Sequence, residues 1–286
     1  MEICERVVDF VALDDPCYWY QLRKKEVLDA LKACSLVARS WLPRSRYHLF
    51  RILGVQCSPD LHAREALLKL LSDNPAIRER VEAICARGPP GQPTLHWITF
   101  HFPRLLSRLR HLRLSDGVIY LPSGPSIDAR FRQFTTVTEL SLNRITFHRH
   151  QDLRRLISAI PHLEKLALFN LRWAKHTPSS PPSIDSPYPG SVTRLRLKEL
   201  IVHAEAAWIT DCQSTSTFHW LTRSGAIAPL AFAFLHLDAL DMQCVHAIAN
   251  LTRMFKSVSK RLILSGETNI ALAACEYSFD QINAES

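Results

Sequence analysis

Histidine and cysteine are the residue types in this chain that could bind a metal or act as nucleophiles, and its 286 residues include 13 histidines and 8 cysteines. No two cysteines have the two-residue spacing of a zinc or redox site, and the gaps between them are long and irregular. His148 and His150 would share one face of a strand, but no third ligand is near them in the sequence. We therefore expect reduced, buried thiols, surface or packing histidines and no bound metal.

Motifs for catalysis or nucleotide binding are absent from the sequence. It has no His-Glu-x-x-His zinc motif, no Gly-x-Ser-x-Gly nucleophile turn, no phosphate-binding loop and no dinucleotide fingerprint. Its 8 glycines are also few for loops in which the backbone must approach a phosphate closely. These observations predict a protein that is not an enzyme and that uses no cofactor.

Arginine is the remaining residue type that could bind a ligand, in a chain whose formal net charge is +8. Two groups of arginines surround two leucine-rich stretches: Arg104, Arg108, Arg110 and Arg113, and then Arg144, Arg149, Arg154 and Arg155. On adjacent strands, some of these guanidinium groups could share a face and hold a carboxylate or a phosphate. Ordinary solvent exposure is the favoured alternative. Nucleic-acid binding is the least favoured, because aromatic residues are not interleaved with the arginines.

An internal repeat predicts the elements that would position these side chains. Four segments share the pattern apolar-x-x-Leu-x-Leu: Leu109–Leu114, Val137–Leu142, Leu163–Leu168 and Val192–Leu197. Their central leucines are residues 112, 140, 166 and 195, so the period is 26 to 29 residues. This period lies within the range of leucine-rich repeats, in which each repeat supplies a strand and a covering helix. Alternate leucines on such a strand would face the core together.

Other segments complete the expected order of strands and helices. Val81, Ile84 and Ala86 match the repeat pattern, so we predict a strand within Arg78–Arg87 despite its high helix propensity. The expected helices are Ala66–Leu71, Leu95–Leu106, Asp152–Ile160, Phe218–Leu221 and Val245–Val258. Further strands are expected at Leu235–Leu237 with Leu240, and at Arg261–Leu264. Residues 174–191, rich in proline and serine, should form a loop.

The first 54 residues form the other predicted unit. Apolar residues between Ile3 and Val11 predict a short helix that begins near the first residue. In the stretch Ala30–Arg51, apolar residues at steps of three and four predict an amphipathic helix from about Lys24 to Leu42. Pro43 should end this helix, and a short second helix should follow. A domain this small needs a partner, or the next domain, to cover part of its apolar surface.

The same stretch resembles the F-box of fungal F-box proteins. The resemblance rests on Ser35-Leu36-Val37, Arg39 and Trp41, which stand in the order of the family pattern and precede the segment RSRYHLF. It implies that the N-terminal helices dock on the Skp-type adaptor of a cullin–RING ubiquitin ligase. The residues that match the motif and are expected at this contact are Ile3, Val7, Leu31, Leu36, Val37 and Trp41.

These six residues are not expected to act alike. Leu31, Leu36 and Val37 should lie nearest the adaptor, and Trp41 should pack where the helical domain meets the repeats. Leu36 and Val37 add a second apolar face beside the stripe that runs from Leu31 to Trp41. One face of the helix could therefore pack against the core while the other contacts a partner.

Together these features predict an α/β protein with two parts. Residues 1–54 would form a small F-box-like helical adapter, truncated because the Leu-Pro dipeptide that opens the family's motif does not precede Met1-Glu2-Ile3. Residues 55–286 would form a curved leucine-rich-repeat solenoid of short parallel strands and covering helices. The resemblance implies a non-catalytic substrate receptor of a Skp–cullin–F-box ubiquitin ligase that holds a target protein on its repeat face. The alternative is an interaction scaffold that has lost the ligase link.

The expected cellular location follows from sequence features that are missing. The sequence has no cationic and apolar leader and no apolar run of about 18 residues that could cross a bilayer. With reduced cysteines, this predicts a cytoplasmic or nuclear protein without a membrane partner. The target protein itself cannot be predicted, because repeats of this kind share a scaffold while their surfaces diverge.

Overall fold

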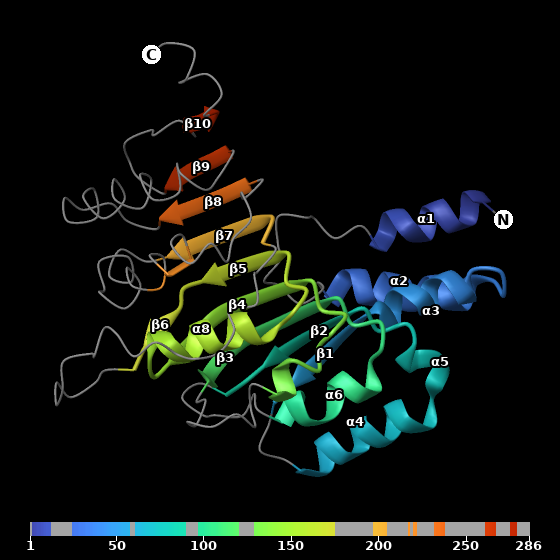
Figure 1. Cartoon of the computed structure of the whole chain (residues 1–286). Coiled ribbons are helices and arrows are strands. Elements are labelled where there is room, and N and C mark those ends of the chain that lie inside the picture. The colour runs from blue at the N-terminus through green and yellow to red at the C-terminus, as the bar shows by residue number, and fades with distance from the viewer. Residues whose placement is uncertain are drawn as a thin grey trace.

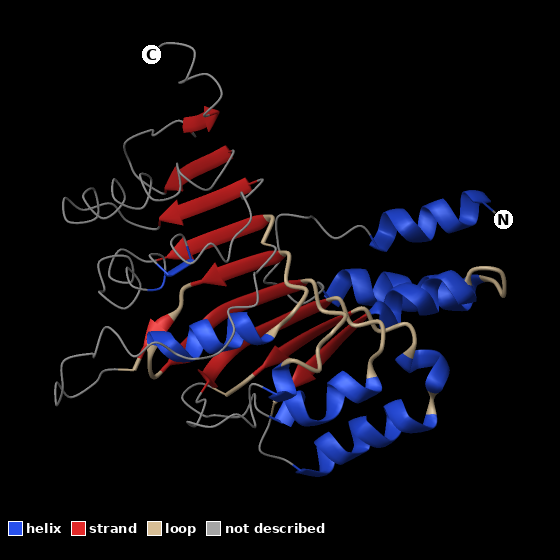
Figure 2. Ribbon diagram, viewed as in Figure 1, coloured by secondary structure: helices blue, strands red, loops and turns tan. Residues whose placement is uncertain are grey.

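One mostly parallel sheet, accompanied by helices, organises the chain in the computed structural model (Figure 1). The structure describes residues 2–12, 25–57, 61–89, 97–119, 129–174, 197–204, 217, 220–221, 232–237, 261–266 and 275–278. The sheet has ten strands, of which β6 pairs only with β4, and the others follow the order β1-β2-β3-β4-β5-β7-β8-β9-β10. The fold is therefore mixed α/β, with neighbouring strands that follow one another along the chain (Figure 2).

The strands and helices have the following bounds. The strands are β1 Ile52–Gln56, β2 Ala83–Arg87, β3 His111–Ile119, β4 Glu139–Phe147, β5 Lys165–Phe169, β6 Arg172–Trp173, β7 Glu199–Ala204, β8 Phe232–Leu237, β9 Arg261–Gly266 and β10 Cys275–Ser278. The helices are α1 Glu2–Ala12, α2 Lys25–Val37, α3 Leu42–Arg51, α4 Leu61–Asp73, α5 Pro75–Arg78, α6 Ile98–Leu105 and α8 His150–Ala159. From β1 to β9 along the main order, adjacent strands pair in parallel. The last strand, β10, pairs with β9 in antiparallel orientation.

Three rows of apolar side chains cross the sheet on one face and hold its strands in register. The middle row runs through Ile84, Leu112, Leu140, Leu166 and Leu200, which pair strand by strand. The flanking rows are Val81, Leu109, Val137, Leu163 and Leu197 on one side, and Ala86, Leu114, Leu142, Leu168 and Val202 on the other. All of these residues are at most 3% exposed. They share one core with residues of α4, α6 and α8, so these helices cover this face.

Four of the predicted strands are present. Strands β3, β4 and β5 correspond to those predicted at Leu109–Leu114, Val137–Leu142 and Leu163–Leu168, and β2 is the strand predicted within Arg78–Arg87. The fourth repeat was aligned wrongly. Its central residue is Leu200, which pairs with Leu166, and not Leu195. The segment Leu197–Val202 follows the repeat pattern with Val202 in place of the last leucine, and the β-branched Ile201 and Val202 favour it as a strand.

Strand β1 was not predicted from the sequence. Leu53 pairs with Ile84 and Val55 with Ala86, so β1 continues the apolar rows of the sheet. The pattern was hidden because Gly54 interrupts the segment and weakens its strand propensity. Helix α3 ends at Arg51 and β1 begins at Ile52, so the helical part passes into the sheet without a linker. The domain boundary expected after residue 54 falls inside this strand.

Most other predicted elements within the described residues are present. Ala66–Leu71 lies in α4, Leu95–Leu106 contains α6, and Asp152–Ile160 corresponds to α8. The strands expected near residues 235 and 261 are β8 and β9, whereas β10 was not predicted. The helix expected at 245–258, the first two residues of that at 218–221 and the loop after residue 174 lie outside the described residues. His148 and His150 do not share a strand, because β4 ends at Phe147 and α8 begins at His150.

The three N-terminal helices have a small core of their own. Val8, Ala12 and Leu31 are buried there, and Trp41 and Leu49 are among the partly buried residues that pack against them. The helix expected to reach Leu42 ends earlier, at Val37, and a turn over residues 38–41 follows it. Pro43 does not stop a helix but opens α3, where its missing N–H costs no hydrogen bond.

The apolar rows generate a prediction about stability. Leu200→Ala should lower the free energy of unfolding by about 2 to 5 kcal/mol, because it leaves a cavity beside Leu166 in the buried middle row. Leu70→Ala is the matched control, since Leu70 on α4 is 49% exposed. Urea denaturation of the full chain followed by circular dichroism measures both. Equal losses in the two variants would contradict the register described for β7.

Candidate functional site

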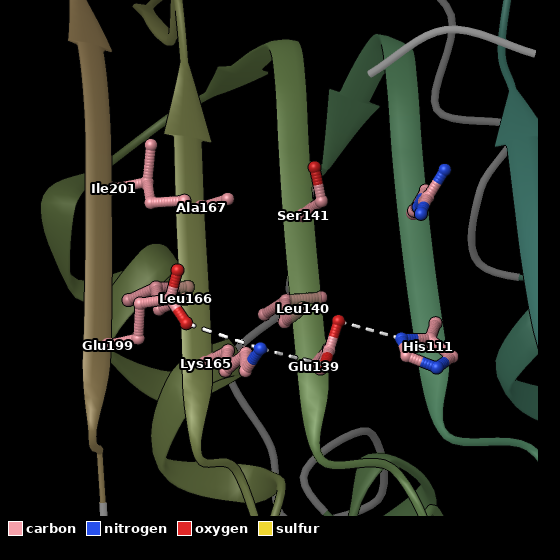
Figure 3. Close-up of a pocket in the computed structure, with 10 residues that line it drawn as sticks. His111, Glu139, Leu140, Ser141, Lys165, Leu166, Ala167, Glu199 and Ile201 are labelled. Atoms are coloured by element: carbon pink, nitrogen blue, oxygen red, sulfur yellow. Dashed lines mark hydrogen bonds and ion pairs between the residues drawn. The ribbon is translucent and has the colours of Figure 1, made fainter. Parts of the chain in front are cut away.

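The sheet face opposite the apolar rows, here called the open face, carries the polar side chains of the strands. Since side chains alternate along a strand, the register that buries Leu112 and Leu140 aligns the intervening residues on this face. One line of these residues, here called the charged row, consists of His111, Glu139, Lys165 and Glu199 on β3, β4, β5 and β7. Figure 3 shows this row beside a hollow in the open face.

A hydrogen bond and two ion pairs join the side chains of the charged row. Nδ1 of His111 lies 2.7 Å from Oε2 of Glu139. Nζ of Lys165 lies 3.5 Å from Oε1 of Glu139 and 3.2 Å from Oε2 of Glu199. Burial alone would raise the pKa of Glu139, but the hydrogen bond and charge of His111 and the ammonium of Lys165 outweigh it, so the pKa is lowered. Glu139 is therefore held ionised, as a structural ion pair requires.

A second line of residues on the open face, here called the middle open row, changes from basic to apolar across the sheet. It runs through Cys85, Arg113, Ser141, Ala167 and Ile201, which pair strand by strand from β2 to β7. The hollow beside the charged row includes Arg113 at one end and Ala167 and Ile201 at the other. Such a surface offers different chemistry to different parts of a ligand that lies across the strands.

A second hollow adjoins the first and shares Arg113 and Ser141 with it. Its lining residues are Cys85, Arg87, Arg113, Leu114, Ser115, Ser141 and Asn143. The guanidinium, hydroxyl and amide groups among them are hydrogen-bond donors, and none of these described residues is acidic. We call this the donor hollow. Its chemistry suits an anion.

An ion-pair network at the ends of the strands fixes the position of Arg87. The carboxylate of Asp116 lies 2.7 Å from Nε of Arg87 and 2.7 Å from Nε of Arg144. Asp116 on β3 and Arg144 on β4 have positive φ values of 49° and 52°, as does Asn170, directly after β5, at 47°. Each of the three follows the buried middle row by four residues, so the same backbone turn recurs at the same place in successive repeats of the sheet.

The arginine groups expected from the sequence are only partly brought together. Arg113 lies on the open face, whereas Arg104 lies on α6 and Arg108 and Arg110 lie in the segment before β3. Arg144 pairs with Asp116, and Arg154 on α8 stacks over Trp220. The sequence did not indicate Arg87 and Asp116. Their ion pair joins two different strands, and the sequence of one strand does not show which residues of the next strand lie beside it.

Of the six residues expected at an adaptor contact, the five with described side chains divide into an exposed and a packed group. Leu36 and Val37 are 86% and 67% exposed at the end of α2, and Val7 on α1 is 43% exposed. Leu31 was expected nearest the adaptor, but it is 0% exposed because it packs against α1 residues Val8 and Ala12. Trp41 is half-buried against the same cluster. Ile3 lies within α1, and its side chain is not among those described.

Phe10 is a further exposed apolar residue on α1, and sequence reasoning did not select it. It is 76% exposed, next to Asp9. Of the described large apolar residues, only Leu36 is more exposed. Helices α1 and α2 therefore both present apolar side chains to solvent.

A charged cluster holds α1 against α3. Nη2 of Arg44 donates to Oδ2 of Asp9 over 2.8 Å, and Nε2 of His48 lies 2.8 Å from Oδ1 of Asp9. The hydrogen bond from Arg44 is the main reason that the pKa of Asp9 falls to about 2. Burial is the main reason that the pKa of His48 is lowered, so its neutral form is favoured. Both shifts mean that this contact weakens as the pH falls, because Asp9 then becomes neutral and the buried His48 becomes charged.

The described cysteines form no disulfide. Cys57 and Cys85 are buried, and Cys4 and Cys34 are half-buried. Burial raises the pKa of the Cys57 thiol to about 11, so this side chain stays protonated and unreactive at neutral pH. Cys57 thus behaves as the reduced, buried thiol that the sequence predicted.

Comparison with known proteins gives no family for the chain. No family model matches it, and no curated protein sequence is significantly similar to it. Within the described part of the chain, no group of three or more histidine, cysteine, aspartate or glutamate residues could hold a metal ion. No helix in the same residues is long and apolar enough to cross a membrane.

The contact of Asp9 with Arg44 and His48 generates a prediction about pH. Because the pKa of Asp9 falls from 3.8 to about 2 on folding, its contribution to stability is complete well above pH 3.8 and is lost as the pH falls from there toward 2. The Asp9→Asn variant should have weaker protection of α1 amides from hydrogen exchange at pH 5, and it should lose less protection than the wild type on acidification.

Asp29→Asn is the control for this experiment. Asp29 pairs only locally with Lys32, three residues away on the exposed face of α2. Its substitution should leave the protection of α1 unchanged, because exposed pairs of this kind contribute little. Equal α1 protection in the wild type and in Asp9→Asn at pH 5 would contradict the role given to Asp9.

Proposed function

We propose that the chain is a non-catalytic substrate receptor of a Skp–cullin–F-box ubiquitin ligase. In this proposal the N-terminal helices form an F-box-like domain that docks on a Skp-type adaptor, and the sheet holds a target protein on its open face. The observation that carries the proposal is the exposure of Leu36 and Val37, 86% and 67%, at positions that match the F-box motif. Two adjacent large apolar side chains in water favour a protein contact at that place.

The helix-turn-helix arrangement of α2 and α3 supports this proposal further. Trp41 anchors the turn, since its carbonyl accepts a hydrogen bond of 3.0 Å from the N–H of Ser45 and its ring packs on the core around Leu31. The stripe from Leu31 to Trp41 thus packs in the core of the helical domain, whereas Leu36 and Val37 stay exposed and could contact a partner. Val7 and Phe10 on α1 add apolar area to the exposed surface of these helices.

We also propose that the strands and their covering helices form a leucine-rich-repeat solenoid. Successive parallel strands that lie side by side in chain order support this, as do central residues at 84, 112, 140 and 166. The wider interval to Leu200 contains the proline- and serine-rich segment. Repeat proteins accept insertions of this kind and use the exposed face of their strands for recognition.

The link between the two parts would let the receptor orient its target. Helix α3 passes directly into β1. Glu82 joins the two parts, because its Oε1 accepts a hydrogen bond of 3.1 Å from the hydroxyl of Tyr47 and its N–H donates to the carbonyl of Arg51 over 2.9 Å. A target on the open face would therefore be held at a fixed place relative to the adaptor. The chain would act by raising the local concentration of the target at the ligase.

The second candidate function is an interaction scaffold without a ligase. The burial of Leu31 favours it, because one of the three residues expected nearest the adaptor is unavailable to any partner in this conformation. The scaffold would use the same open face to bind its target. Adaptor binding therefore distinguishes the two functions.

The receptor function predicts binding to a Skp-type adaptor through the end of α2. Full-length protein should bind purified adaptor in a calorimetric titration, and Leu36→Asp with Val37→Asp should weaken binding by roughly 30-fold or more, the effect of losing a central contact. Leu70→Asp is the matched control, because Leu70 is 49% exposed on α4. Absence of binding, or equal binding by the double variant, would refute the ligase link and leave the scaffold.

A further inference from the structure

The two hollows of the open face form one surface whose chemistry changes in a single direction. Along the middle open row, Arg113 lies on β3, Ser141 on β4, Ala167 on β5 and Ile201 on β7. Between β3 and β7 the surface thus changes from an arginine to apolar residues.

At the basic end, the donor hollow has the composition of a carboxylate site. Arg87 and Arg113 provide guanidinium groups, Ser141 provides a hydroxyl and Asn143 provides an amide, whereas the hydroxyl of Ser115 donates to the carbonyl of Ala86 over 3.4 Å. Asp116 divides its carboxylate between Arg87 and Arg144, so it does not neutralise Arg87 completely. A guanidinium group binds a carboxylate through two parallel hydrogen bonds, which also fixes the direction of the bound group.

At the other end, Ala167 and Ile201 determine what can bind. Ile201 lies two residues after Glu199 on β7, and both line the same hollow (Figure 3). The carboxylate of Glu199 is paired with Lys165 over 3.2 Å, so Ala167 and Ile201 are left to accept an apolar side chain. The two ends of the surface therefore select different residues.

We propose that the open face recognises an extended segment of a partner protein through one acidic and one large apolar residue, about four positions apart. The acidic residue binds in the donor hollow beside Arg113, and the apolar residue packs on Ala167 and Ile201. This inference rests on the proposed function, because it describes the target that the receptor would hold. It leaves the direction of the bound chain open, since either order of the two residues meets the same surface.

The spacing follows from the geometry of the sheet. Three strand intervals separate Arg113 on β3 from Ile201 on β7, because only β4 and β5 lie between these strands. At about 4.8 Å for each interval, the distance is about 14 Å. An extended chain covers about 3.3 to 3.6 Å per residue, so about four residues bridge this distance. A helix would need roughly nine residues, because it rises only about 1.5 Å per residue.

Peptides of varied spacing test the proposal directly. Full-length protein is titrated, by fluorescence anisotropy, into labelled peptides that carry one Asp and one Leu in a Gly- and Ser-rich background, with the separation varied from one to eight positions. Affinity should be highest at separations of three to five. Equal affinity at all separations, or no binding at any, would overturn the proposal.

Two variants and a control identify the surface. Arg113→Glu should weaken binding of the best peptide by about tenfold or more, and a peptide with Lys in place of Asp should restore binding to this variant. Ile201→Asp should weaken binding of the original peptide. Arg108→Glu makes the same charge change in the turn before β3 and should have no effect. Equal binding by Arg113→Glu and Arg108→Glu would overturn the assignment of the donor hollow.

Adaptor binding, measured on the same preparations, separates this inference from the proposed function and reports on folding. Protein that binds the adaptor but shows no spacing-dependent peptide binding would refute the inference alone. Protein that binds the peptides as described but not the adaptor would refute the ligase link alone.

Discussion

The alignment of apolar side chains across the sheet is the constraint on which the other features of this protein depend. Leu112, Leu140 and Leu166 pair directly with one another and are each 1% exposed, so a slip of one residue in any strand would turn its apolar side chains to solvent. The same register fixes what lies on the opposite face. Because Leu140 is buried, Glu139 and Ser141 must face outward beside the corresponding residues of β3 and β5.

This constraint also holds the side chains of the open face in place, as the proposed binding of a target there requires. Its polar residues are held by backbone pairing and by cross-strand contacts such as that of Glu139 with His111 and Lys165. Such residues lose little conformational freedom when a ligand binds, so less of the interaction energy is spent on ordering them. Strand β1 extends the same rigidity to α3, because it pairs with β2 and follows Arg51 directly.

Sequence reasoning predicted features that depend on local alternation, and failed where distant pairing decides. The pattern of Val81, Ile84 and Ala86 identified β2 correctly although local propensity favoured a helix. The fourth repeat was misplaced because Leu197 belongs to two overlapping frames, and only pairing with β5 selects the later one. Arg87 and Asp116 meet only through adjacent strands, and the burial of Leu31 depends on α1 packing against α2. Neither relation is visible in a single segment.

We propose, as the central claim, that the chain presents two independent protein-binding surfaces, the end of α2 and the open face. The most direct measurement is light scattering coupled to size-exclusion chromatography of the full chain mixed with a Skp-type adaptor and a target that carries the acidic and apolar pair. The account predicts a complex of all three with one copy of each, in which the adaptor leaves the affinity for the target unchanged. The account would be contradicted if the chain formed a complex with each partner separately but never with both at once.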